Sequence, residues 1–92
     1  MNATVVYDGV KILNLVPRES DDHTIHWFEV VTMQGSDINT LNCDKLVFSD
    51  LVVGEEYSLV LSIQEVVKAS GNKAFKTHKF KITDYIPFQS EN

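Results

Sequence analysis

Hydrophobic and polar residues alternate over most of the chain, with the period of two that indicates half-buried β-strands. The clearest stretch is 57–67, where one parity holds Tyr57, Leu59, Leu61 and Ile63 and the other holds the polar residues Ser58, Ser62 and Gln64. In the last such stretch, 75–86, Phe80 and Ile82 share a parity in the same way. We expect these six side chains to be buried, because their alternation pairs two adjacent strands over one apolar face. Further strands are predicted over residues 4–16, 24–33 and 38–43.

Breaks in the alternation predict where the chain bends and turns. Gly9 interrupts the first strand and suits a bulge or a sharp bend. Loops are predicted over residues 17–23 and 68–74, and the second is expected to be flexible because it is centred on Gly71 and Asn72.

Residues 44–51 hold the only plausible helix, with Asn42 or Asp44 as its cap, and a helix this short is expected to plug a core. The element order predicts an all-β protein, a five-stranded antiparallel barrel with at most one short helix. This order is similar to that of the oligonucleotide/oligosaccharide-binding (OB) barrel, where the ligand crosses strands two and three between the loops after strands one and four. Another small barrel or an open five-stranded sandwich is the alternative. We expect the barrel over residues 1–86 and a short extension over 87–92.

Composition places the chain among globular proteins of one domain. Its 92 residues are 43% hydrophobic and 23% charged. No apolar run approaches the ~20 residues that cross a bilayer, and no signal peptide is visible at the start. The single cysteine, Cys43, cannot form an intrachain disulfide, so a reducing cytoplasm is the expected location.

Charge is unevenly distributed along the chain. The net charge of −5 argues against coating nucleic acid by bulk positive charge. However, residues 1–67 carry three basic residues against eleven acids, a net charge of −8, whereas residues 68–92 carry five lysines against two acids, a net charge of +3. A single strand of nucleic acid is held by ammonium groups along its backbone and by aromatic faces under its bases. The candidate nucleic-acid contacts are therefore Lys68, Lys73, Phe75, Lys76, Lys79 and Lys81.

Two of the aromatic residues have competing interpretations. In one interpretation Phe75 stacks on a base. In the other, Phe75 fills the barrel mouth and the nearby lysines only keep the protein soluble. Trp27 is a candidate stacking platform if it faces outward on the second strand. It also shares a parity with Ile25, Val31 and Met33, which favours a place in the core.

Other chemistries find little support in the sequence. The possible metal ligands are Asp21, Asp22, His23, His26 and Cys43, but they lack paired spacing, and the two histidines would face opposite sides of a strand. A Gly-rich phosphate loop, a nucleophile elbow and a His-Glu-x-x-His run are all absent. We expect neither an enzyme, nor a metal site, nor a cofactor.

Two motifs carry a family resemblance. The segment Leu51–Leu59 (LVVGEEYSL) looks like the turn into the fourth strand of small oligonucleotide-binding barrels, and the whole chain resembles the compact versions among bacteriophage single-stranded DNA-binding proteins. The segment Asp84–Phe88 (DYIPF) is similar to the acidic tip by which bacterial single-stranded DNA-binding proteins recruit partners. In that family the phenylalanine carries the terminal carboxylate, whereas four residues follow Phe88.

The leading hypothesis is a non-enzymatic single-stranded DNA-binding barrel with a replication or recombination role in a phage. If the protein is phage-encoded, the expected cytoplasm is that of the host. The alternative is a protein-interaction barrel, such as a phage adaptor or an inhibitor of a host protein, whose acidic surface comprises Glu19, Asp21, Asp22, Glu55 and Glu56. Docking of a protein partner through Ile86–Phe88 is a separate hypothesis, and its alternative is that Phe88 packs against the barrel. No membrane partner is expected, and a homodimer through an exposed edge strand is left open.

Overall fold

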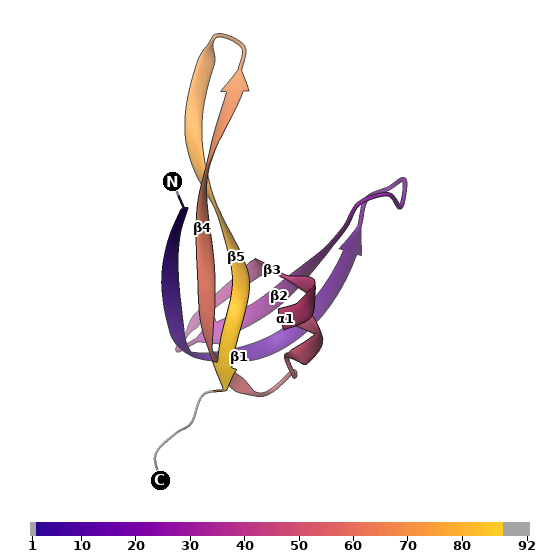
Figure 1. Ribbon diagram of the computed structural model, residues 1–92, viewed down its shortest axis with the longest axis vertical. Coiled ribbons are helices and arrows are strands. Elements are labelled where there is room, and N and C mark those ends of the chain that lie inside the picture. The colour runs from indigo at the N-terminus through magenta and orange to yellow at the C-terminus, as the bar shows by residue number, and fades with distance from the viewer. Residues whose placement is uncertain (1, 88–92) are drawn as a thin grey trace.

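The computed structural model describes residues 2–87, which form five strands and one short helix closed into a barrel (Figure 1). The elements are β1 (Asn2–Glu19), β2 (His26–Gln34), β3 (Asp37–Cys43), α1 (Lys45–Asp50), β4 (Glu56–Ser70) and β5 (Lys73–Pro87). Hydrogen bonds join the strands in the order β1-β2-β3-β5-β4 and back to β1. The prediction of a five-stranded barrel with one short helix is confirmed.

One strand pair departs from the predicted antiparallel arrangement. β3 and β5 run parallel and pair through Asn42 with Lys81 and Cys43 with Ile82, while the other four pairs are antiparallel. The reason is geometric, because strand direction cannot alternate all the way around a closed ring with an odd number of strands. A five-stranded barrel therefore needs one parallel closure, and the barrel is mixed.

Gly9 bends β1 as the sequence predicts. Its φ of +64° lies in the left-handed region that glycine adopts without strain, and the register with β4 shifts between Tyr7 and Val10. The bend helps one strand pair with two neighbours, because β1 pairs with β4 from Asn2 to Lys11 and with β2 from Lys11 to Glu19.

The core confirms four of the six predicted buried residues. Tyr57, Leu59, Leu61 and Ile82 are buried. Ile63 is only half-buried and Phe80 is 43% exposed, so the prediction is wrong for these two. They form a cross-strand pair just beyond the last β3–β5 pair. Within residues 2–87 no strand other than β4 pairs with β5 at Phe80, whereas Ile63 still pairs with Ala3 of β1.

The short helix is a plug, as predicted. Asp44 caps α1, its side chain accepting the backbone N–H of Leu46 at 3.1 Å. Val47 and Leu51 are buried in the barrel core, and the Phe48 ring packs on Phe28 of β2 with centroids 4.7 Å apart. The helix thus closes the lower end of the barrel between β3 and β4 (Figure 1).

Two hairpins extend beyond the closed barrel, β4–β5 along the 57 Å long axis of the molecule and β1–β2 to one side of that axis (Figure 1). The prediction of a flexible loop over 68–74 is wrong, because β4 and β5 stay paired up to Ser70 and Lys73. Gly71, with φ of +62°, begins a two-residue turn of the II′ pattern, which suits strand twist. The β1–β2 hairpin likewise stays paired up to Glu19 and His26, so the predicted loop over 17–23 shrinks to residues 20–25.

Candidate nucleic-acid interface

The β4–β5 hairpin has two faces, and five of the six predicted binding residues share the one that points out of the barrel. Directly paired residues of an antiparallel hairpin project to the same side. Lys68 pairs with Phe75, Lys73 with Ser70, Lys79 with Gln64 and Lys81 with Ser62, while the buried pair Leu61–Ile82 belongs to the opposite side. We call the outward group the lysine face: Lys68, Lys73, Phe75, Lys79 and Lys81.

Lys76 lies on the other side of the hairpin. It pairs with Val67, and its Nζ lies 3.1 Å from Oε1 of Glu65 in an exposed ion pair. Successive side chains of a strand point to opposite faces, and Lys76 is three residues from both Lys73 and Lys79. It must therefore lie on the face opposite to theirs. Of the six predicted residues, Lys76 is thus the one that the fold does not bring to the lysine face.

Phe75 is 49% exposed on the lysine face. The interpretation that it fills the barrel mouth is therefore wrong. Phe80, on the opposite side of β5, lines an opening of about 240 Å³ together with Tyr7, Leu41 and Leu61. The six residue steps from Lys81 to Phe75 span ~20 Å at the usual rise of a strand.

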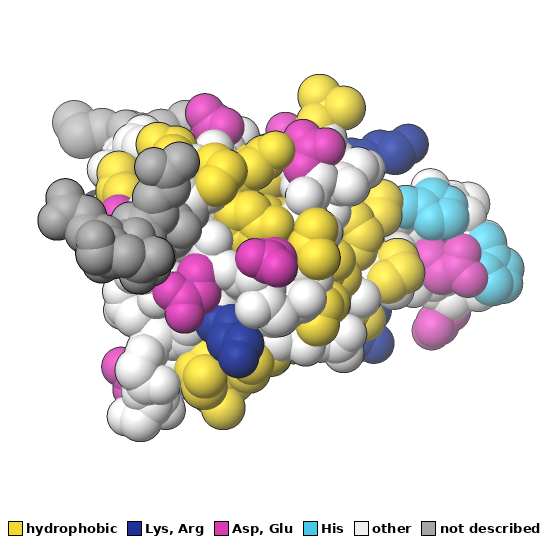
Figure 2. Space-filling view, turned by 90° about the horizontal axis from the view of Figure 1, so that it is seen from below, with side chains coloured by type: hydrophobic (Ala, Val, Ile, Leu, Met, Phe, Trp, Pro, Cys, Tyr) yellow, Lys and Arg dark blue, Asp and Glu magenta, His cyan; other side chains and the backbone are white. Residues whose placement is uncertain are grey.

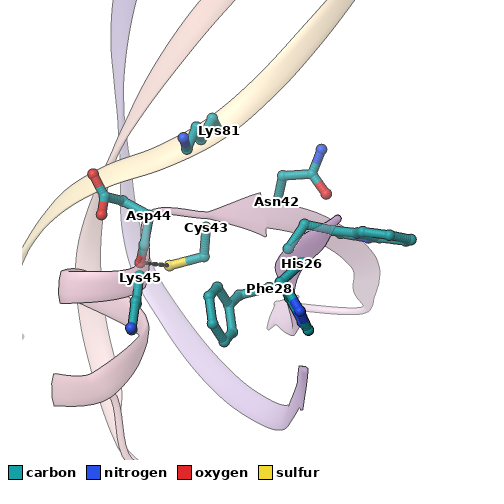
Figure 3. A pocket seen from close by; sticks show the side chains of 8 residues that line it. His26, Phe28, Asn42, Cys43, Asp44, Lys45 and Lys81 are labelled. Atoms are coloured by element: carbon teal, nitrogen blue, oxygen red, sulfur yellow. Dashed lines mark hydrogen bonds between the residues drawn. The ribbon is translucent and has the colours of Figure 1, made fainter. Parts of the chain in front are cut away.

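A groove of about 670 Å³ begins where the lysine face meets the barrel (Figure 3). Lys81 overhangs it from β5, Asn42 and Cys43 line it from β3, and Phe28 lies opposite (Figure 3). The remaining lining residues are His26, Trp27, Asp44 and Lys45. The register explains the junction, because Lys81 pairs with Asn42, and Asn42 with Glu29 of β2.

Trp27 lies on this outward surface, and the interpretation that places it in the core is wrong. Its side chain is 37% exposed. The even-numbered residues of β2 point into the barrel instead, and two of them, Val30 and Thr32, are fully buried. Its indole Nε1–H donates to Oε2 of Glu29 at 3.2 Å. The structure thus joins Trp27 and the lysine face across β3, as one continuous outer surface.

Glu29 holds two side chains at once. Its Oε1 accepts from Nε of Arg18 at 2.9 Å, while Oε2 accepts from Trp27. These bonds, Arg18 first and Trp27 second, lower the pKa of the Glu29 carboxyl, because hydrogen bonds to the charged form favour it. Sequence reasoning missed Arg18 and Glu29. The parity of Trp27 and Glu29 on one strand was a visible signal, but the approach of Arg18 depends on the β1–β2 register, with Arg18 opposite Trp27.

The tip of the β1–β2 hairpin is acidic and carries two histidines. Glu19 lies 2.8 Å from Nδ1 of His23 and 3.8 Å from Nδ1 of His26. Hydrogen bonds from the Ser20 and Thr24 hydroxyls lower the pKa of Asp22 to about 2. Figure 2 shows these cyan and magenta side chains gathered at one end of the molecule, beyond a central patch of hydrophobic side chains.

Cys43 offers no nucleophile at the groove. It is 4% exposed, and burial, followed by the charge of Asp44, raises the pKa of its thiol to about 12.

Within residues 2–87, no three His, Cys, Asp or Glu side chains gather closely enough to hold a metal ion. The same part of the chain contains no helix with the length and apolar character needed to cross a membrane.

The C-terminal motif is described only in part. Ile86 is 59% exposed at the end of β5, and Pro87 pairs with Tyr57. Phe88 and the rest of the predicted extension lie outside the described residues.

Comparison of the chain with protein-family models, curated proteins and solved structures returned no match.

Proposed function

We propose that the protein binds single-stranded DNA on the outer surface that runs from Trp27 along the lysine face to Phe75. The observation that carries this proposal is the continuity of that surface. Lys81 belongs to the lysine face and also overhangs the groove that Trp27 lines. Two aromatic platforms are thus connected by a line of ammonium groups, the combination that single strands require.

The strand order supports this location for the ligand. The order β1-β2-β3-β5-β4, with a helix between β3 and β4, resembles that of the oligonucleotide/oligosaccharide-binding barrel. In such barrels the ligand crosses strands two and three, flanked by the loops after strands one and four. The groove lies on β2 and β3, and the β1–β2 and β4–β5 hairpins flank it.

Each residue class has a separate physical role in the proposal. Lys68, Lys73, Lys79 and Lys81 neutralise phosphates and displace counterions, so they make binding depend on salt. Phe75 and Trp27 stack on bases, and each stack contributes about 1–3 kcal/mol with little salt dependence. The surface is open and sequence-tolerant, and the proposed role is non-enzymatic.

The first experiment compares two double variants by fluorescence anisotropy of labelled oligo-dT from low to moderate salt. Lys73→Ala with Lys79→Ala removes two charges from the lysine face. We expect lower affinity and a slope of log K against log salt that is shallower by about 1.4, at ~0.7 for each phosphate. The matched control, Lys11→Ala with Lys76→Ala, removes the same charge from positions outside that face and is expected to change the slope little.

Two outcomes contradict the proposal. Equal losses in both double variants would mean that bulk charge, and not the lysine face, attracts the oligonucleotide. No binding at ~20 mM salt, where screening is weak, would end the nucleic-acid hypothesis. The second result would favour the protein-interaction barrel, for which the acidic tip of the β1–β2 hairpin is the candidate docking surface.

A further inference from the structure

A carboxylate in the middle of a surface that binds a polyanion needs an explanation. The Glu29 side chain lies beside Trp27 on the outer face of β2 and is 23% exposed. It would repel a nearby phosphate if its charge were free. Both of its oxygens are instead occupied, one by Trp27 of the same strand and one by Arg18 of the neighbouring strand.

Arg18 retains most of its hydrogen-bonding capacity in this arrangement. A guanidinium has five N–H donors, and Nε alone is committed to Glu29. The four N–H groups on the two terminal nitrogens make no hydrogen bond within residues 2–87. The planar fork of an arginine is well suited to bidentate contact with a phosphate.

We propose that Arg18 binds the phosphate next to the base stacked on Trp27, and that Glu29 is the positioning residue that fixes both side chains. This inference rests on the proposed function and deepens it, because it adds a cation from the otherwise acidic β1–β2 hairpin to the interface. Glu29 restrains the indole plane through Nε1 and aims the free edge of the guanidinium. Its own charge is offset locally by Arg18.

The sign of one substitution separates positioning from bulk electrostatics. Glu29→Gln removes a negative charge from the interface, so electrostatics alone predicts tighter binding of oligo-dT. In the wild type, Trp27 and Arg18 each donate to a different oxygen of Glu29. A glutamine has an NH₂ donor in place of one of these oxygens, so it cannot accept both hydrogen bonds in the same geometry. We therefore expect Glu29→Gln to weaken binding, by roughly tenfold for the loss of one charge-assisted contact.

The matched control is Glu65→Gln, which also removes one negative charge from an ion-paired glutamate but lies on the side of the hairpin with Lys76. It is expected to leave the affinity unchanged or slightly raised. Arg18→Ala should make the salt slope shallower by about 0.7, whereas Arg18→Lys should keep the slope and lose affinity. Tighter binding by Glu29→Gln, or an unchanged slope in Arg18→Ala, would overturn the inference while leaving the proposed function intact.

A measurement without DNA tests the positioning role by itself. Trp27 is the only tryptophan of the chain, so intrinsic fluorescence reports on it alone. Glu29→Gln should make the indole more mobile, which lowers its fluorescence anisotropy and increases its quenching by acrylamide, while Glu65→Gln should match the wild type. Identical anisotropy and quenching in all three proteins would refute a positioning role even if no variant binds DNA.

Discussion

At the scale of single residues, accessibility and hydrogen bonding decide which side chains are available for chemistry. Cys43 and Trp27 both line the groove, but Trp27 is 37% exposed and Cys43 only 4%. The Cys43 thiol also has the backbone carbonyl of Asp44 at 3.4 Å as its acceptor. The groove therefore exposes an aromatic side chain, while the thiol of its cysteine is covered.

The thiol of Cys43 is predicted to be unreactive in the folded protein. A pKa of about 12 leaves on the order of one thiolate in 10⁴ at pH 8, and burial blocks the reagent as well. Labelling with a chromogenic disulfide reagent should be very slow in the native state and fast after denaturation. Equal rates in both states would show that the thiol is accessible and that its pKa is not raised.

Parity along a strand predicted individual burial well where neighbouring strands surround the position, and poorly elsewhere. Leu59 and Leu61 are buried because β1 and β5 pair with β4 on either side of them. Phe80 has the same parity as Ile82 but lies beyond the last β3–β5 pair. The sequence contains no signal for where a distant strand stops pairing, so periodicity alone did not separate the two.

At the scale of elements, the β4–β5 hairpin is the least predictable part of the fold. Its outer half is exposed on both faces, so burial of one face does not distinguish a strand there from the flexible loop predicted over 68–74. The pairing there is local and follows from the tight turn at Gly71. Helix α1 was predictable because its cap Asp44 and its apolar contacts are close in sequence.

Shortening this hairpin should separate binding from folding. Deleting residues 67–70 and 73–76 joins Val66 to Thr77 through the same Gly71-Asn72 turn, and Val66 and Thr77 already pair in the native register. Every deleted residue is exposed, so the melting temperature should change little. The lost ion pair of Lys76 with Glu65 lies on the surface and contributes little.

The shortened protein should nevertheless bind oligo-dT much more weakly, because Lys68, Lys73 and Phe75 are gone. Thermal unfolding monitored by circular dichroism and anisotropy titrations on the same sample measure the two effects. Unchanged affinity would place the interface on the barrel alone. A large fall in melting temperature would show instead that the hairpin stabilises the barrel.

At the scale of the whole molecule, the charges are separated in space as well as in sequence. The acidic tip belongs to the β1–β2 hairpin and the lysine face to the β4–β5 hairpin, and the groove lies between them. The sequence predicted the lysine cluster because its members are close along the chain. It did not predict the contact of Arg18 with Glu29, which depends on a register between two strands.

The distance between the two aromatic platforms predicts a dependence on oligonucleotide length. Phe75 lies ~20 Å along β5 from Lys81, which overhangs the groove, whereas four stacked nucleotides span ~14 Å at the 3.4 Å rise per strand. A dT4 bound in the groove, detected by quenching of Trp27, should therefore be insensitive to Phe75→Ala. A dT12 is long enough to contact both platforms, and Phe75→Ala should weaken its binding by about 1–3 kcal/mol with little change in salt slope.

Trp27→Phe serves as the comparison, because it preserves a smaller ring at the groove and should weaken dT4 and dT12 alike, as measured by anisotropy of labelled oligonucleotides. If Phe75→Ala weakens both lengths equally, the strand does not run from the groove along the lysine face. If it weakens neither, Phe75 is not a stacking platform, and the lysines alone make the hairpin part of the interface. The proposed path thus requires a loss that appears only with the longer strand.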